Sequence, residues 1–340
     1  MSGQQSERYT LIGSNGSPYS LKMRALMRYR RLPFDWVLRT TRNRSEFETV
    51  KPALVPVLKL PEDGSLHIDS TPLIYRLEDR HPDTRSVIPD NKAHAFLSHL
   101  IEDMADEWCT KMMFHYRWTY DADIKYASYW IADDSFPDEV REKRDEMAKS
   151  FAERQIGRMP LVGCTPENAP VIETGYQRIL SLLETHVGQY DFLFGTRPSI
   201  GDFGLYGQLR VLATDPTPLS IIRAVAQRTE SWLRQMDDAS GIEGDWAATD
   251  ALPAATQGLL DFAGYVYLPF LAANAQAISK GLDSFNLTLL DHPYSQGVFP
   301  YQVKCLQDLK RRYNELSEEN KNTVDNHLGG TGALEILAPN

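Results

Sequence analysis

The residue with the clearest chemical potential near the N-terminus is Ser17, which stands directly before Pro18 in the segment SNGSPYSLKMRALMRYRR. Proline is favoured at the first position of a helix, so we expect Ser17 at the N-cap. A hydroxyl group there can donate a hydrogen bond to an anion that also feels the positive end of the helix. This turn could therefore stabilise an anion. The structural alternative is that Ser17 only caps the helix.

Other hydroxyl groups lie close by. Ser14 and Ser20 are the local alternatives to Ser17, and we expect Tyr19 to pack or to form a wall of a site. The segment SPYS contains no cysteine, which argues against thiol–disulfide exchange at this turn. The three cysteines of the chain are widely spaced and indicate no disulfide framework.

The hydrophobic pattern places this turn in a compact α/β module at residues 1–82. The expected elements are a strand at 8–13, a helix at 17–29, a strand at 34–41, two hairpin strands at 55–60 and 65–69, and a helix at 70–81. Ser70 is placed to cap the last helix, with Pro72 in its first turn.

The rest of the chain is expected to be mostly helical. A polar, proline-containing linker at 83–93 precedes an all-α domain at 94–240, and residues 241–340 form an extension. Helices are expected in the all-α domain at 94–118, 124–131, 137–158, 167–187, 199–213 and 218–237. Ser199 and Asp202 have the spacing of a capping box. The extension is expected to contain a helix at 256–279, a hairpin and a helix at 301–316, and to pack on the helical domain or over the cleft.

The order of these elements resembles the glutathione transferase superfamily. The features that carry the resemblance are the strand before SPYS, the VP dipeptide before the hairpin, the acidic-Ser pair at the start of the helix at 70–81, and the SIGD capping box. The resemblance covers about residues 8–240. It implies a thioredoxin-like N-terminal domain, a cis peptide bond before Pro56, and glutathione as the co-substrate.

The resemblance also implies roles for individual residues. Ser17 would be the catalytic group that stabilises the thiolate, and the glutathione-binding residues would be Tyr19, Val55, Pro56, Asp69 and Ser70. Val55 would pair with the backbone of the cysteinyl part, and the acidic-Ser pair would recognise the γ-glutamyl group. A thiol with a pKa near 8.5 is mostly protonated at neutral pH, and lowering that pKa by about two units requires about 2.7 kcal/mol.

One position departs from the family pattern. The family often has a basic residue directly before VP, where this chain has Leu54. Lys51, Arg42 and Arg44 are therefore the candidates to bind the glycyl carboxylate.

The segment 107–130 is rich in aromatic residues and would lie next to the cleft between the domains. Trp108, Met112 and Tyr116 are the residues that we assign to an apolar acceptor pocket. The alternative, more common for such a stripe, is that these side chains form the core.

An acidic helix face precedes this segment. His99, Glu102, Asp103 and Asp106 share one side of the expected helix, which we interpret as a solvated surface. No second group of ligands stands at metal-binding spacing, so we expect no metal site.

The whole chain has 36 basic and 46 acidic residues, and this excess of negative charge argues against nucleic-acid binding. No apolar stretch predicts a signal peptide or a membrane span, so we expect a cytoplasmic protein. The resemblance implies a homodimer with a role in detoxification.

The leading hypothesis is a glutathione transferase that joins the sulfur of reduced glutathione to a small apolar electrophile. The alternative is a binding or interaction protein that has this fold without turnover. The long extension and Leu54 favour this alternative slightly.

Overall fold

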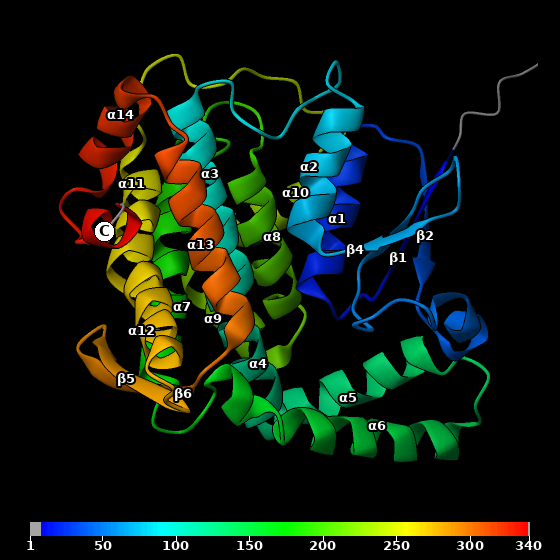
Figure 1. The fold of residues 1–340 in the computed structure, drawn as a ribbon. Coiled ribbons are helices and arrows are strands. Elements are labelled where there is room, and N and C mark those ends of the chain that lie inside the picture. The colour runs from blue at the N-terminus through cyan, green and yellow to red at the C-terminus, as the bar shows by residue number, and fades with distance from the viewer. Residues whose placement is uncertain (1–7, 339–340) are drawn as a thin grey trace, which may run out of the picture.

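The computed structural model describes residues 8–338. Its N-terminal part is an α/β domain with a four-stranded sheet in the order β2-β1-β3-β4 (Figure 1). Strands β1 and β2 are parallel, whereas β3 is antiparallel to both β1 and β4. The elements are β1 (Tyr9–Gly13), α1 (Pro18–Tyr29), β2 (Phe34–Leu38), the 3-10 helix η1 (Thr41–Phe47), β3 (Val57–Lys59), β4 (Leu66–Ile68) and α2 (Ser70–Arg80). The expected order is confirmed, except that η1 was not predicted.

The two faces of this sheet are covered by different elements. Successive residues of a strand point to opposite faces, so Leu11 joins the main core with α1 and α2, while Ile12 packs with Phe47 of η1. Helices α1 and α2 lie between the sheet and the helical part of the chain (Figure 1). The start of α1 therefore faces the helical part directly.

Residues 92–237 are helical, as expected. This part contains α3 (Lys92–Met104), the π-helix η2 (Ala105–Cys109), α4 (Thr110–Thr119), α5 (Asp121–Ser135), α6 (Arg141–Ile156), the 3-10 helix η3 (Met159–Val162), α7 (Ala169–His186), α8 (Ile200–Leu212), α9 (Pro216–Val225) and α10 (Gln227–Asp237). The capping box of Ser199 and Asp202 is present at the start of α8. None of the helices within residues 8–338 is long and apolar enough to cross a membrane.

Two expected helices of the all-α domain are divided. The helix expected at 94–118 contains η2, where π-type turns replace α-helical ones between α3 and α4. The helix expected at 218–237 is broken at Ala226, where φ is −144°, into α9 and α10. Hydrophobic periodicity continues across both interruptions, so it could not reveal them.

The C-terminal extension forms a layer beside α3 and α7 (Figure 1). It consists of α11 (Ala254–Phe262), the π-helix η4 (Ala263–Tyr267), α12 (Leu268–Ser279), the hairpin β5 (Ser284–Leu289) and β6 (His292–Gly297), α13 (Pro300–Asn314), α14 (Glu318–Leu328) and α15 (Ala333–Leu337). The last two helices were not predicted. Helix α13 runs along α3 and approaches the α/β domain on the side of α2 (Figure 1).

A buried ion cluster joins the α/β domain to the helical part. The Nζ atom of Lys22 in α1 lies 2.6 Å from Glu102 Oε1 and also contacts the carboxylate of Asp106. The side chains of Lys22 and Glu102 are fully buried. Farther along α1, Arg24 and Arg28 bind Asp237 at the end of α10, each at 2.9 Å. The basic face of α1 is thus matched by acids of the helical part.

Replacement of the central cation should destabilise the fold strongly. Lys22→Met would leave two carboxylates buried without a cation, and we expect the free energy of unfolding to fall by about 3–5 kcal/mol. Urea denaturation followed by circular dichroism measures this difference.

The matched control is Lys143→Met. Lys143 pairs with Glu146 at 3.2 Å on the exposed side of α6, and its loss should cost less than about 1 kcal/mol. A loss for Lys22→Met no larger than that for the control would contradict the importance of the buried cluster.

Candidate functional site

The register of the sheet brings three candidate segments together at one end of the strands. Ile12 of β1 lies opposite Val57 of β3, and Val57 lies opposite Ile68 of β4. The chain that follows β1, the chain that precedes β3 and the chain that follows β4 therefore meet at the same end of the sheet. These segments carry Ser17, Val55–Pro56 and Asp69–Ser70 respectively.

Ser17 is the N-cap of α1, as predicted. Its backbone is extended, with φ −102° and ψ 119°, and its Oγ accepts a hydrogen bond from the N–H of Ser20 at 3.3 Å. Within residues 8–338, its hydroxyl hydrogen has no acceptor. The side chain is partly exposed, so this hydrogen can be donated to a bound group.

The alternative hydroxyl groups are less suitable. Ser20 is fully buried, and its Oγ accepts the N–H of Ser14 at 3.3 Å. Tyr19 donates its hydroxyl to the backbone carbonyl of Asp106 in η2 at 2.9 Å. Burial raises the pKa of Tyr19 well above its ordinary value, so the phenol stays protonated. Ser14 is partly exposed and remains the one local alternative among these residues.

The turn before Ser17 is held by the helical part of the chain. Arg117 of α4 donates from Nη1 to the carbonyl of Gly16 at 3.0 Å and from Nε to Asp215 at 2.7 Å. Asn15 donates to Asp134 of α5 at 2.9 Å. A Cβ on Gly16 would come within 3.1 Å of the ring of Trp130. No local sequence pattern indicates these contacts, because the partners lie more than a hundred residues away.

The segment before β3 contains backbone groups that have no hydrogen-bond partner. The peptide bond between Val55 and Pro56 is cis, as the resemblance implied. Within the described part of the chain, neither the N–H nor the C=O of Val55 has a hydrogen-bond partner. Leu54 is 54% exposed, and its uncharged side chain cannot supply a positive charge.

The candidates for the glycyl carboxylate differ in their availability. Arg42 forms an exposed, bidentate pair with Asp138, with its closest contact at 2.6 Å. Lys51 and Arg44 are exposed and make no ion pair with another described residue. The binding of the glycyl carboxylate stays a prediction for these three residues.

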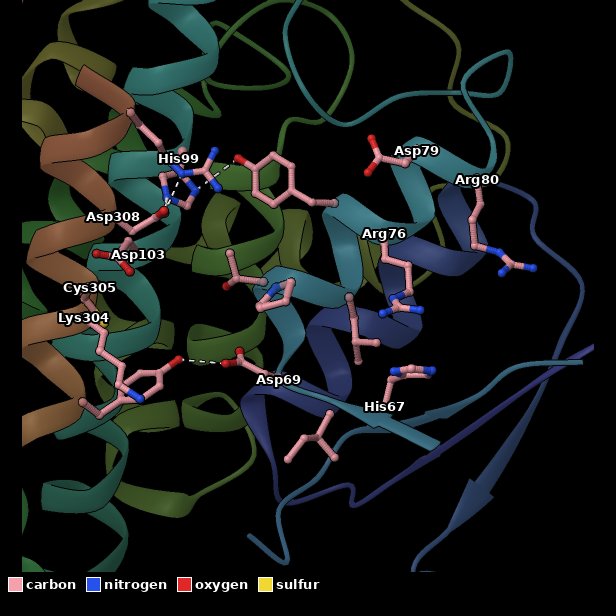
Figure 2. Close-up of a pocket in the computed structure, with 17 residues that line it drawn as sticks. His67, Asp69, Arg76, Asp79, Arg80, His99, Asp103, Lys304, Cys305 and Asp308 are labelled. Atoms are coloured by element: carbon pink, nitrogen blue, oxygen red, sulfur yellow. Dashed lines mark hydrogen bonds and ion pairs between the residues drawn. The ribbon is translucent and has the colours of Figure 1, made fainter. Parts of the chain in front are cut away.

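Asp69 has an unusual backbone conformation between β4 and α2. Its φ of 76° and ψ of 109° are rare for a residue with a side chain, and such residues concentrate at functional sites. Asp69 is the N-cap of α2, but its side chain makes no capping hydrogen bond. Its Oδ2 instead accepts a hydrogen bond at 2.9 Å from Tyr301 of the extension (Figure 2).

The predicted capping role of Ser70 is wrong. Ser70 is the first residue of α2 rather than its cap, and its buried Oγ donates to Asp106 at 3.4 Å. The backbone N–H groups of Ser70 and Thr71 have no acceptor within residues 8–338. N–H groups in the first turn of a helix lack an acceptor within the helix, so these two can bind an anion.

The predicted solvated acidic face is also wrong. His99 is 2% exposed, Glu102 is fully buried and Asp106 is 7% exposed, because α1, α2 and the extension cover this side of α3. Periodicity showed that these residues share a face, but it could not show what covers that face. The structure contains no group of three possible metal ligands within residues 8–338.

The buried carboxyl groups of this cluster outnumber the cations that pair with them. Burial raises the pKa of Asp106 to about 7 even beside Lys22, since Glu102 shares the same ammonium. Burial also raises the pKa of Glu107 to about 7, and that of Asp103 well above its ordinary value. Burial acts against ionisation of Glu102 as well, but Lys22 outweighs it and holds that pKa below its ordinary value.

The side chains assigned to the acceptor pocket lie in the core. Trp108, Met112 and Tyr116 are 1%, 0% and 2% exposed. The ring of Trp108 packs at 5.2 Å from Phe270 of the extension, and that of Tyr116 at 5.1 Å from Tyr176. These three side chains therefore form part of the core, which is the alternative to an acceptor pocket. An acceptor could reach them only after they move.

The N-terminal domain matches a known family model. Residues 11–85 match the family model described as "Glutathione S-transferase, N-terminal domain". This match includes all three segments at the edge of the sheet. The α/β domain followed by helices confirms the fold class that the sequence predicted.

Several solved structures are similar at low sequence identity. A glutathione S-transferase from Methylobacterium radiotolerans, in complex with glutathione sulfonate, is 20% identical; the similarity covers 71% of this chain and 97% of that chain, with a TM-score of 0.42. A glutathione S-transferase from Ceriporiopsis subvermispora, in complex with glutathione, is 15% identical over 68% and 98%, with a TM-score of 0.46. The beta-etherase LigF from Sphingobium sp. is 18% identical over 74% and 98%, with a TM-score of 0.45. The comparison with curated proteins gave no match.

The contact that holds the turn can be tested with a double-mutant cycle. Arg117→Met removes the donor to Gly16 and leaves the carboxylate of Asp215 buried without a cation, so we expect a loss of about 3–5 kcal/mol in unfolding free energy. Asp215→Asn added to the first variant removes that buried charge. The double variant should recover at least about 1 kcal/mol in urea denaturation. Strictly additive losses would contradict a coupled Arg117–Asp215 pair.

Proposed function

We propose that the chain is a glutathione transferase that binds reduced glutathione at the edge of the sheet and transfers its sulfur to an apolar electrophile. The observation that carries this proposal is the position of Ser17. The hydroxyl hydrogen of Ser17 has no acceptor among the described residues. Ser17 stands at the N-terminus of α1 and lies at the same end of the sheet as Val55 and Asp69. The match of residues 11–85 to a glutathione S-transferase domain supports the same assignment.

The binding step follows from the groups that this edge leaves free. The unpaired N–H and C=O of Val55 can pair with the cysteinyl residue of the tripeptide, as an added short strand would. The free N–H groups at the start of α2 suit a carboxylate, and Asp69 suits an ammonium. These contacts fix the sulfur in front of Ser17, so that reaction does not depend on a chance encounter.

The chemical step requires a thiolate. The thiol of bound glutathione releases its proton to solvent, and the hydroxyl of Ser17 and the positive end of α1 stabilise the remaining negative charge. The sulfur then donates an electron pair to the electrophilic carbon, and the carbon–sulfur bond forms as a leaving group departs or as the adduct takes up a proton. Ser17 forms no covalent bond in this sequence.

A non-catalytic binding protein is the second candidate. Two observations favour it: Tyr301 already binds Asp69, and the residues expected to form the acceptor wall are buried. Turnover of glutathione with an electrophile decides between the two candidates. A homodimer, a cytoplasmic location and a role in detoxification stay predictions under either one.

The catalytic role of Ser17 can be tested with three variants. We expect Ser17→Ala to lower kcat with an aromatic halide electrophile by about a hundredfold at neutral pH, the usual effect of losing one donor to a developing anion. Binding of glutathione, measured by calorimetry, should change much less. Ser17→Thr retains a hydroxyl group and should restore most of the activity.

The matched control is Ser14→Ala, because Ser14 is the partly exposed alternative on the same turn. It should keep kcat within about threefold of the wild-type value. Loss of activity in Ser14→Ala but not in Ser17→Ala would transfer the role to Ser14. Absence of glutathione binding by the wild-type protein at millimolar concentration would refute the proposed function.

A further inference from the structure

A pocket of about 800 Å³ lies between α2 of the α/β domain and α13 of the extension (Figure 2). Its walls include Asp69 and Arg76 on one side and Tyr301, Lys304 and Asp308 on the other. Asp69 therefore belongs both to this pocket and to the proposed glutathione site.

Some charged groups in the pocket walls are already paired with groups of opposite charge. Asp308 accepts from Arg311 and Arg312 and lies 3.3 Å from the Nε2 atom of His99. Arg80 forms a bidentate pair with Glu62. Within residues 8–338, three charged side chains of the pocket walls make neither an ion pair nor a hydrogen bond: Arg76, Asp79 and Lys304.

Of these three, Lys304 is the free cation that shares a helix with Tyr301, the residue that contacts Asp69. It follows Tyr301 by three residues in α13, so both side chains lie on the same face of that helix, and Tyr301 contacts Asp69. Arg76 is six residues from the start of α2, about 9 Å along the helix axis. A ligand group next to Asp69 therefore meets Lys304 rather than Arg76.

The surroundings of Asp69 favour an added positive charge. Behind it, Glu102, Asp103, Asp106 and Glu107 follow one another in α3 and η2, and Lys22 is the single lysine or arginine that pairs with them among residues 8–338. A ligand ammonium beside Asp69 would favour the ionised form of these carboxyl groups. A ligand carboxylate beside it would meet Lys304 and the free N–H groups at the start of α2.

We propose that α13 completes the substrate site: Lys304 binds the carboxylate of the γ-glutamyl end of the thiol substrate, and Tyr301 orients Asp69 toward the ammonium of the same group. This inference rests on the proposed function. It makes the extension a part of the site that selects a thiol carrying a free α-amino-acid end. Lys304 contacts the ligand, whereas Tyr301 is a positioning residue that acts through Asp69.

The geometry at Asp69 explains how Tyr301 can orient this carboxylate without blocking the binding of an ammonium. The hydroxyl of Tyr301 occupies Oδ2 at 2.9 Å, and Oδ1 accepts no hydrogen bond from the described residues. Burial and the nearby carboxylate of Asp69 keep the phenol protonated by raising the pKa of Tyr301, so it is a permanent donor. One oxygen is thereby fixed in place while the other stays open to an ammonium.

The test compares glutathione with two analogues that each lack one charged group. Glutaryl-Cys-Gly lacks the amino group, and 4-aminobutanoyl-Cys-Gly lacks the carboxylate. Kd is measured by calorimetry for the full-length wild-type protein, Tyr301→Phe and Lys304→Met, and kcat is recorded alongside. Arg76→Met is the matched control, because it removes another free cation from the same pocket.

We expect Lys304→Met to raise Kd about tenfold for glutathione and for the analogue that lacks the amino group, but not for the analogue that lacks the carboxylate. Tyr301→Phe should raise Kd about fivefold for the two ligands with an amino group and leave glutaryl-Cys-Gly unchanged. In both variants, kcat at saturating glutathione should stay within about twofold. Arg76→Met should bind all three ligands as the wild-type protein does.

The possible failures are distinct. If the wild-type protein binds glutathione but both variants bind it equally well, the role of α13 is refuted and the proposed function stands. Equal weakening of all three ligands would indicate a general disturbance of the fold and would also refute the inference. If the wild-type protein binds no glutathione, both proposals fail together.

Discussion

The buried ammonium of Lys22 is the contact on which the arrangement of this protein depends. It lies between Glu102 and Asp106, so it ties α1 of the α/β domain to the junction of α3 and η2. Asp106 also accepts a hydrogen bond from Ser70 at the start of α2, and its carbonyl accepts one from Tyr19. One turn of the helical part thereby fixes the starts of both helices that border the candidate site. Because charges buried without partners are costly, this network specifies how the two parts fit together.

The second constraint is the register of β3 between β1 and β4. It places Ser17, the free backbone of Val55 and the strained Asp69 at one end of the sheet, although they are up to 52 residues apart in sequence. Arg117 holds the turn before Ser17 from one side, and Tyr301 holds Asp69 from the other. The sheet brings the groups together, and the helices around it restrict their movement. Rigid support of this kind is what stabilisation of a reactive anion requires.

The sequence predicted those features that depend on local chemistry. Pro18 marked the start of α1 and hence the N-cap at Ser17, and the spacing of Ser199 and Asp202 identified the capping box of α8. The strands of the α/β domain followed from short apolar runs and their turns. The resemblance supplied the cis bond before Pro56, which no residue pattern alone would have indicated.

The features that sequence analysis missed depend on contacts between distant segments. Lys22 was part of a basic run and Glu102 part of an acidic face, and only the packing of α1 on α3 turns both into a buried pair. The capping role was assigned to Ser70 because serine is a common N-cap, whereas the left-handed backbone of Asp69 moves the helix start by one residue. The partnership of Asp69 with Tyr301, 232 residues away, had no signal in the sequence.

Stabilisation of a thiolate by this site would lower the pKa of the bound thiol. The thiolate of glutathione absorbs in the ultraviolet, so a pH titration of the complex, corrected for the free protein, gives this pKa. We expect a value about two units below the ordinary 8.5. A bound thiol that titrates at or above 8.5 would contradict it.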